Sequence, residues 1–165
     1  MKFLKNKRTR WLVVGLIAGL IALTGGLKLA TWNNTQVSYY DAGTSAYQHG
    51  HMQAAIVLFD ESLSAYHQDL NRDWFEQAIY PAADRELAAL ADFQKGEALL
   101  QMKQDAAAVQ AWEESLQLNP GNGPSYANLS TADANRMHEE ALVVKYDLEK
   151  LLLNNPQLVQ VQGNG

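Results

Sequence analysis

Two segments of this chain repeat each other at an offset of 53 residues. The stretch GTSAYQHGHMQAAIVLFDESL, residues 43–63, aligns with GEALLQMKQDAAAVQAWEESL, residues 96–116. A glycine, an alanine pair and the tripeptide Glu-Ser-Leu recur, and an aromatic ring stands at the same place, Phe59 in one copy and Trp112 in the other. An internal repeat predicts two copies of one supersecondary unit stacked together, because a single copy cannot bury its own apolar face.

The body of the chain carries helical signals throughout. From Gln36 onward there is no strand-like alternation, and alanine, leucine, glutamine and glutamate, all good helix formers, dominate. Prolines and glycines divide the pattern into segments. The predicted helices cover 36–49, 52–66, 70–79, 82–102, 105–118 and 133–154, with a loop at 119–132 and a frayed polar tail at 156–165. The predicted fold class is therefore all-α.

The repeated positions resemble the tetratricopeptide repeat. That pattern has a small residue in its first helix, then an alanine, an aromatic and a small residue in its second helix, and a closing proline. The matching residues are Gly43, Ala55, Phe59 and Ser62 in the first unit, and Gly96, Ala108, Trp112, Ser115 and Pro120 in the second. The resemblance implies a helical-hairpin solenoid over residues 36–155, ending in a C-terminal capping helix.

The chain departs from that pattern at two places. Lys103 stands where the turn between the paired helices favours glycine, which Gly50 supplies in the first unit. The offset is also longer than the usual period of about 34 residues, so an insertion of about nineteen residues separates the units. The insertion contains NRDWFEQAIYP.

A narrower resemblance involves the C-terminal half. The runs FQKGEALLQMKQDAAAVQAWEESLQLNPGN and HEEALVVKYDLEKLLLNNP are similar to membrane-anchored repeat proteins encoded beside MoxR-type ATPases and von Willebrand factor A-domain proteins, including those of aerotolerance operons. This resemblance implies other proteins as partners, either subunits of a membrane complex or von Willebrand factor A-domain proteins.

The N-terminal segment is predicted to be a transmembrane helix. Residues 11–30 read WLVVGLIAGLIALTGGLKLA, with Lys28 as the one charge, which is long enough to span a bilayer. Residues 1–10 form a basic tip, which predicts a cytoplasmic N-terminus and a translocated body. The chain is thus expected to be a single-pass protein of a bacterial inner membrane, with a cytoplasmic N-terminus and a periplasmic or extracytoplasmic C-terminal domain. A cleaved signal peptide is the competing interpretation, although no clear A-x-A site follows the apolar run.

Charge and composition argue against several functional classes. Residues 31–165 hold 7 basic and 18 acidic residues, a net charge of −11, so nucleic acid is not an expected partner. Cysteine is absent, and no nucleophile elbow, phosphate loop or metalloprotease helix occurs. His49 and His51 flank Gly50 at a turn and are better read as exposed than as metal ligands. We therefore expect no enzymatic activity, no catalytic residue, no cofactor and no metal.

Two sets of residues are candidate partner-binding surfaces. By analogy with the repeat family, the first helices line a groove that is aromatic, amide-bearing and mildly acidic, which favours an apolar or basic helix or peptide. Its residues are Tyr40, Thr44, Tyr47, Gln48, Phe93, Glu97 and Gln101. The alternative is that these rings pack between helices. The second set lies in the insertion and comprises Trp74, Phe75 and Tyr80; here too, the rings would alternatively fill the gap between the repeats.

Two functions compete on this basis. The first is a membrane-anchored scaffold or assembly factor that binds partner proteins through its helical-repeat surface. The second is a permanent accessory subunit of a larger membrane complex, in which the transmembrane helix packs on neighbouring subunits. The match Gly15-x-x-x-Gly19 favours close helix contact of that kind.

Overall fold

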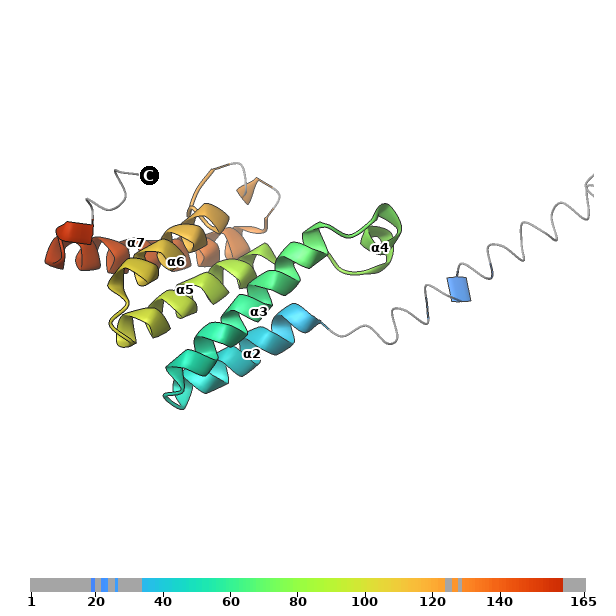
Figure 1. Cartoon of the computed structure of the whole chain (residues 1–165). Helices are drawn as coiled ribbons and strands as arrows, with labels where there is room; N and C mark the ends of the chain where they lie inside the picture. The colour runs from blue at the N-terminus through green and yellow to red at the C-terminus, as the bar shows by residue number, and fades with distance from the viewer. Residues whose placement is uncertain are drawn as a thin grey trace, which may run out of the picture. The chain divides into compact units, whose positions relative to one another are not determined.

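The computed structural model describes residues 34–123, 126–127 and 129–158, together with the isolated positions 19, 22, 23 and 26. These residues are helical and contain no strand, so the all-α prediction is confirmed. The helices are α2 (Thr35–Gln48), α3 (Met52–Leu70), α4 (Trp74–Ile79), α5 (Arg85–Gln101), α6 (Asp105–Leu118) and α7 (Thr131–Asn154) (Figure 1).

The predicted membrane segment lies outside the described residues, apart from the four isolated positions. The basic tip at 1–10 and the end of the polar tail, 159–165, lie outside them as well. Among the helices that the structure does describe, none combines the length and the apolar character needed to cross a bilayer.

The chain divides into two compact units. One consists of Asn34–Asn71 with Ala83–Gly165, and the other of Met1–Asn33 with Arg72–Ala82. The larger unit contains five of the labelled helices, and α4 belongs to the smaller unit.

Helices α2 and α3 form one antiparallel hairpin, and α5 and α6 form a second with the same contacts. Ser62 donates a 2.9 Å hydrogen bond to the carbonyl of Gln36, and Ser115 donates a 2.7 Å bond to the carbonyl of Ala89. Each serine and each carbonyl is shifted by 53 residues between the copies. The repeat read from the sequence is therefore present in the hydrogen bonding of the hairpins.

A glycine in each hairpin allows an aromatic ring to approach the backbone of the first helix. A Cβ built on Gly43 would lie 2.8 Å from the ring of Phe59, and one built on Gly96 would collide with the indole of Trp112. Both rings are completely buried, as are Ala55 and the equivalent Ala108. All four side chains are therefore buried where the two helices of each hairpin meet.

The turns of the two hairpins are also equivalent. In the first, the amide of His51 bonds the carbonyl of Ala46, and in the second the amide of Gln104 bonds that of Leu99, the pattern of a Schellman motif. The motif requires one residue with a left-handed backbone conformation. That residue is Gly50 (φ 79°) in one turn and Lys103 (φ 63°) in the other. The departure at Lys103 seen in the sequence thus leaves the turn geometry unchanged.

The insertion differs from its prediction. Instead of one helix over 70–79, α3 continues to Leu70 and a new helix, α4, begins at Trp74. Asp73 separates them because its side chain caps α4 by accepting a 2.8 Å hydrogen bond from the amide of Glu76. A similar cap at Asp84 delays α5 to Arg85, three residues after the predicted start.

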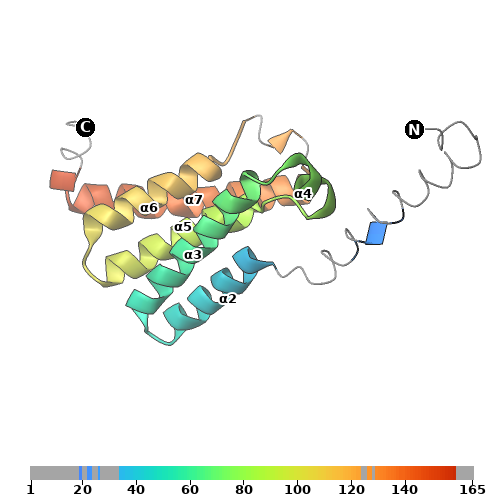
Figure 2. The ribbon, with the colours of Figure 1, turned by 45° about the vertical axis from the view of Figure 1, so that its right-hand side comes forward.

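Helix α7 closes the larger unit. It lies along α6 (Figure 2). Its buried residues are Met137, Ala141 and Val144. Ser130 caps its first turn, so the helix begins two residues before the prediction.

Candidate functional site

Two tyrosines of the predicted groove lie between α2 and α5. Gln94 donates a 2.8 Å hydrogen bond to the hydroxyl of Tyr40 and accepts a 2.9 Å bond from Thr44. Gln101 likewise donates a 2.7 Å bond to the hydroxyl of Tyr47. The phenols and amides therefore join the first helices of the two hairpins, and they are engaged with each other in this structure.

The remaining groove residues lie further along this surface. Phe93 is half-buried; its carbonyl accepts a 3.2 Å bond from the indole of Trp112, and the two rings are 6.5 Å apart. Glu97 is half-buried, whereas Gln48 is exposed. Burial raises the pKa of the Glu97 carboxyl, and the nearby Asp147 carboxylate raises it further.

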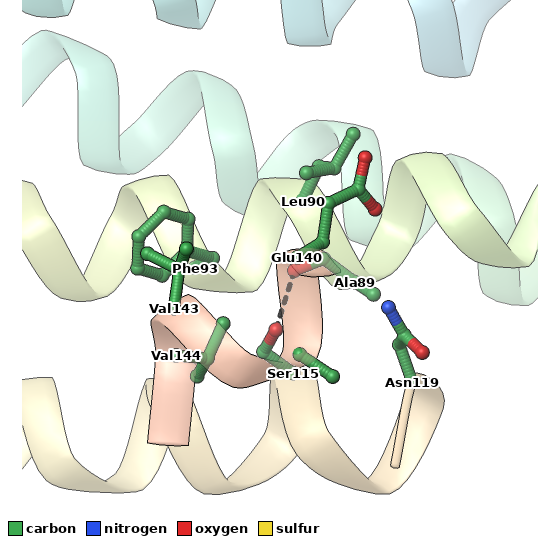
Figure 3. A pocket seen from close by; sticks show the side chains of 9 residues that line it. Ala89, Leu90, Phe93, Ser115, Asn119, Glu140, Val143 and Val144 are labelled. Atoms are coloured by element: carbon green, nitrogen blue, oxygen red, sulfur yellow. Dashed lines mark hydrogen bonds between the residues drawn. The ribbon is translucent and has the colours of Figure 1, made fainter. Parts of the chain in front are cut away.

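A hollow of about 120 Å³ opens between α5, α6 and α7 (Figure 3). Most of its lining is apolar. Ser115 also lines it, and the hydroxyl of this serine donates a hydrogen bond to the Ala89 carbonyl. We call it the α7 hollow. Its lining residues are Ala89, Leu90, Phe93, Ser115, Asn119, Glu140, Ala141, Val143 and Val144.

Glu140 is the one ionisable residue of the α7 hollow. Its Oε2 atom is buried and has no hydrogen-bond partner, while Oε1 lies 4.0 Å from Nε of Arg136. Burial raises the pKa of Glu140, and the Glu86 carboxylate adds to this effect, whereas Arg136 opposes it. A desolvated carboxylate oxygen without a donor is an unfavourable arrangement that an incoming donor would relieve.

The position of α7 depends on contacts made by the loop and by α5. Arg136 makes a bidentate ion pair with Glu86, at 2.7 and 2.8 Å. Asn119 donates a 2.8 Å bond to the carbonyl of Met137, and Lys145 donates a 2.7 Å bond to the carbonyl of Pro120. These contacts fix the wall of the α7 hollow.

The sequence predicts Phe93 as a binding residue. It does not predict the α7 residues that line the hollow, which are Glu140, Ala141, Val143 and Val144. Glu139 and Glu140 are adjacent in the sequence, and nothing in the local sequence distinguishes the two. The structure separates them: Glu139 is exposed, whereas Glu140 lines the α7 hollow.

The insertion places its aromatic residues differently. Trp74 is 80% exposed and rests edge-on against Phe75, with ring centroids 5.8 Å apart. The guanidinium of Arg72 lies 5.0 Å above the ring of Tyr80 and also donates a 2.8 Å bond to the carbonyl of Pro81. Trp74 is thus the most exposed ring of the segment 72–82, and whether these rings form an interface stays a prediction.

A buried carboxylate, Asp92, is a further feature that sequence reasoning missed. Its side chain is 3% exposed, and Oδ1 has no hydrogen-bond partner. Burial raises the pKa of Asp92 to about 7; Lys95 opposes the rise, and Glu114 and Asp60 add to it. Lys95 itself bridges to Asp60 at 2.7 Å, linking α5 to α3. The sequence does hold a signal for this burial, because Asp92 ends the run AALAD, residues 88–92, in which most side chains are small.

The turn histidines are exposed, and His49 bonds the carbonyl of Ser45 at 2.7 Å through Nδ1. His67 is exposed as well.

Comparison with known proteins adds no relative. No family model matches the chain, and neither the curated proteins nor the solved structures contain a match. The tetratricopeptide resemblance therefore rests on the residues themselves.

Proposed function

We propose that this chain is a membrane-anchored scaffold or assembly factor of the tetratricopeptide type, which binds segments of partner proteins on the surface formed by α2, α5 and α7. The observation that carries the proposal is the α7 hollow, with its apolar walls and the unpartnered oxygen of Glu140. Apolar pockets with a few polar groups are typical of binding sites.

The charge of this surface supports a particular kind of partner segment. Glu97, Glu140 and Asp147 are acidic, and the two resolved pKa shifts among them, at Glu97 and Glu140, are both upward. Burial is the main cause of both shifts, Asp147 adds to the one at Glu97, and Glu86 adds to the one at Glu140, so a cation brought to this surface would stabilise the charged carboxylates. The segment that fits best carries an aliphatic side chain for the hollow and a lysine or arginine for Glu140.

The anchor is the second part of the proposal, and it rests on the apolar segment 11–30 and on the basic tip before it. A reporter enzyme that is active only outside the cytoplasm, fused after Gly165, is expected to be active. Activity of a cytoplasmic reporter alone would reverse the proposed orientation.

The partner chemistry is tested by selecting peptides from a random library on the full chain in mild detergent. We expect enrichment of an aliphatic residue next to lysine or arginine. Enrichment of acidic peptides, or of basic peptides without an aliphatic residue, would contradict the proposed role of the α7 hollow.

A permanent subunit of a membrane complex is the second candidate, and one observation favours it. Leu142, Tyr146 and Leu153 are exposed along one side of α7, at the spacing of a single helix face. Purification in mild detergent separates the two functions: companions that remain at fixed stoichiometry in high salt indicate a subunit, whereas companions lost with salt indicate a scaffold.

A further inference from the structure

The loop that contains α4 is attached to the end of the larger unit at which α2 begins. Ser62 of α3 bonds the carbonyl of Gln36 in the first turn of α2, so the last part of α3 runs back toward the start of α2. From Ser62, α3 continues for eight residues to Leu70, which carries it about 12 Å past the level of Gln36 at 1.5 Å per residue. The chain therefore leaves the larger unit beyond the start of α2.

The chain also returns to the larger unit at this end. Gln36 is buried, and its side chain makes two hydrogen bonds to the backbone of Asp84, at 2.7 Å from Nε2 to the carbonyl and at 3.2 Å from the amide to Oε1. Asp84 directly precedes α5. The end of the segment 72–82 that leads into α5 is thus held at the first turn of α2, and its other end follows α3 about 12 Å beyond.

The same end receives the chain from the apolar segment 11–30. Gln36 is only six positions after Ala30, and six residues span at most about 20 Å when fully extended. If residues 11–30 cross a bilayer, as the proposed function requires, Gln36 lies within that distance of the membrane surface. The segment 72–82 is then attached at the end of the unit that faces the lipid.

The composition of the segment matches that location. Trp74 exposes most of its indole and rests edge-on against Phe75, and Arg72 lies over the ring of Tyr80. Tryptophan and tyrosine favour the headgroup region, because their rings are apolar but carry a polar N–H or O–H group. Short-range bonds brace the segment, including a 2.8 Å bond from Gln77 to the carbonyl of Arg72, so the ring positions are fixed locally.

We infer that the segment 72–82 is a second membrane contact, in which the exposed ring of Trp74, with the aromatic residues of the same segment, inserts into the lipid interface. This inference rests on the proposed anchor. Arg72 is offset by Asp73 and Glu76, so the contact depends on aromatic insertion and not on attraction to anionic lipid. A zwitterionic bilayer should therefore be sufficient.

The absence of cysteine allows a direct test on the full chain. Single cysteines replace exposed residues, Ala78→Cys and Ala82→Cys in the segment, and His51→Cys in the turn between α2 and α3. Each variant is labelled with an environment-sensitive fluorophore and reconstituted into phosphatidylcholine vesicles that contain brominated lipid. The probes at 78 and 82 are expected to lose fluorescence to the bromine quencher, and Trp74→Ala should reduce that loss, while the probe at 51 stays unquenched.

Each other outcome overturns the inference in a recognisable way. Equal, unquenched signals at 78, 82 and 51 in protein that resists extraction with alkaline carbonate would overturn the membrane contact and leave the anchor in place. Extraction by carbonate would overturn the anchor and the contact together. Shielding of the probes at 78 and 82 only when a partner protein is added would assign the segment to a protein interface instead.

Discussion

The indole of Trp112 occupies the space that a side chain at position 96 would need. A Cβ on Gly96 would collide with the indole ring, and the ring is buried to 1% exposure. Its N–H is satisfied by the carbonyl of Phe93, so the tryptophan is held by packing and by a hydrogen bond. The same relationship joins Gly43 and Phe59.

Loss of this ring should destabilise the fold strongly. Trp112→Ala is expected to lower the free energy of unfolding by about 3–5 kcal/mol, since it leaves a cavity and removes the hydrogen bond from the indole to the Phe93 carbonyl. The matched control is Trp74→Ala, whose ring is mostly exposed and whose loss should cost less than about 0.5 kcal/mol. Urea unfolding of the full chain in detergent, followed by circular dichroism, compares the two. Similar losses for both tryptophans would contradict the assigned packing.

The two hairpin turns make opposite predictions for equivalent positions. Lys103→Gly should raise the free energy of unfolding by about 0.5–1 kcal/mol, because Lys103 has φ 63°, a conformation that costs little only for glycine. Gly50→Ala, at φ 79°, should lower it by about 1 kcal/mol. The measurement is thermal or urea unfolding of both variants. A destabilised Lys103→Gly variant would mean that the lysine side chain makes a contact that outweighs the backbone strain.

Asp92 predicts a specific pH dependence of stability. Burial raises the pKa of its carboxyl from 3.8 to about 7, so the folded state binds more protons than the unfolded state between those values. The free energy of unfolding should therefore fall as the pH rises from about 4 to 7, with the contribution fully present at the acidic end. Asp92→Asn is neutral at every pH and should flatten this slope.

The size of the effect follows from the same shift. At about 1.36 kcal/mol per pKa unit, Asp92→Asn should stabilise the fold above pH 7 by as much as about 4 kcal/mol. Glu61→Gln, at an exposed position of α3, serves as the control and should keep the slope. An unchanged slope in Asp92→Asn would show that the carboxyl is not protonated in the folded state.

The sequence predicts the hairpins well because their determinants are local and duplicated. The counterparts of Gly43, Phe59 and Ser62 stand 53 residues later as Gly96, Trp112 and Ser115. Each set makes its contacts within one pair of adjacent helices. The break before α4 was missed, although Asp73 and Glu76 stand at the spacing of a helix cap.

The α7 wall could not be predicted in the same way. Glu140 differs from Glu139 only through the way α7 lies on α5 and α6, which depends on contacts such as that between Arg136 and Glu86, 50 residues apart. Such pairings leave no local signal in one sequence. Asp92 is intermediate, because the small residues around it suggest burial but do not reveal its missing partner.

The central claim is that the α7 hollow holds an aliphatic side chain while Glu140 receives a cation. The most direct measurement is the affinity of a library-selected peptide for the full chain and for two variants, Glu140→Gln and Glu139→Gln. We predict that Glu140→Gln weakens binding by about tenfold or more, as expected for loss of a charge-assisted contact, while Glu139→Gln binds like the original chain. Unfolding curves of both variants are measured as well, and Glu140→Gln should be at least as stable as Glu139→Gln, because it removes a carboxylate whose charged form burial disfavours. Equal affinities for both variants would contradict the account.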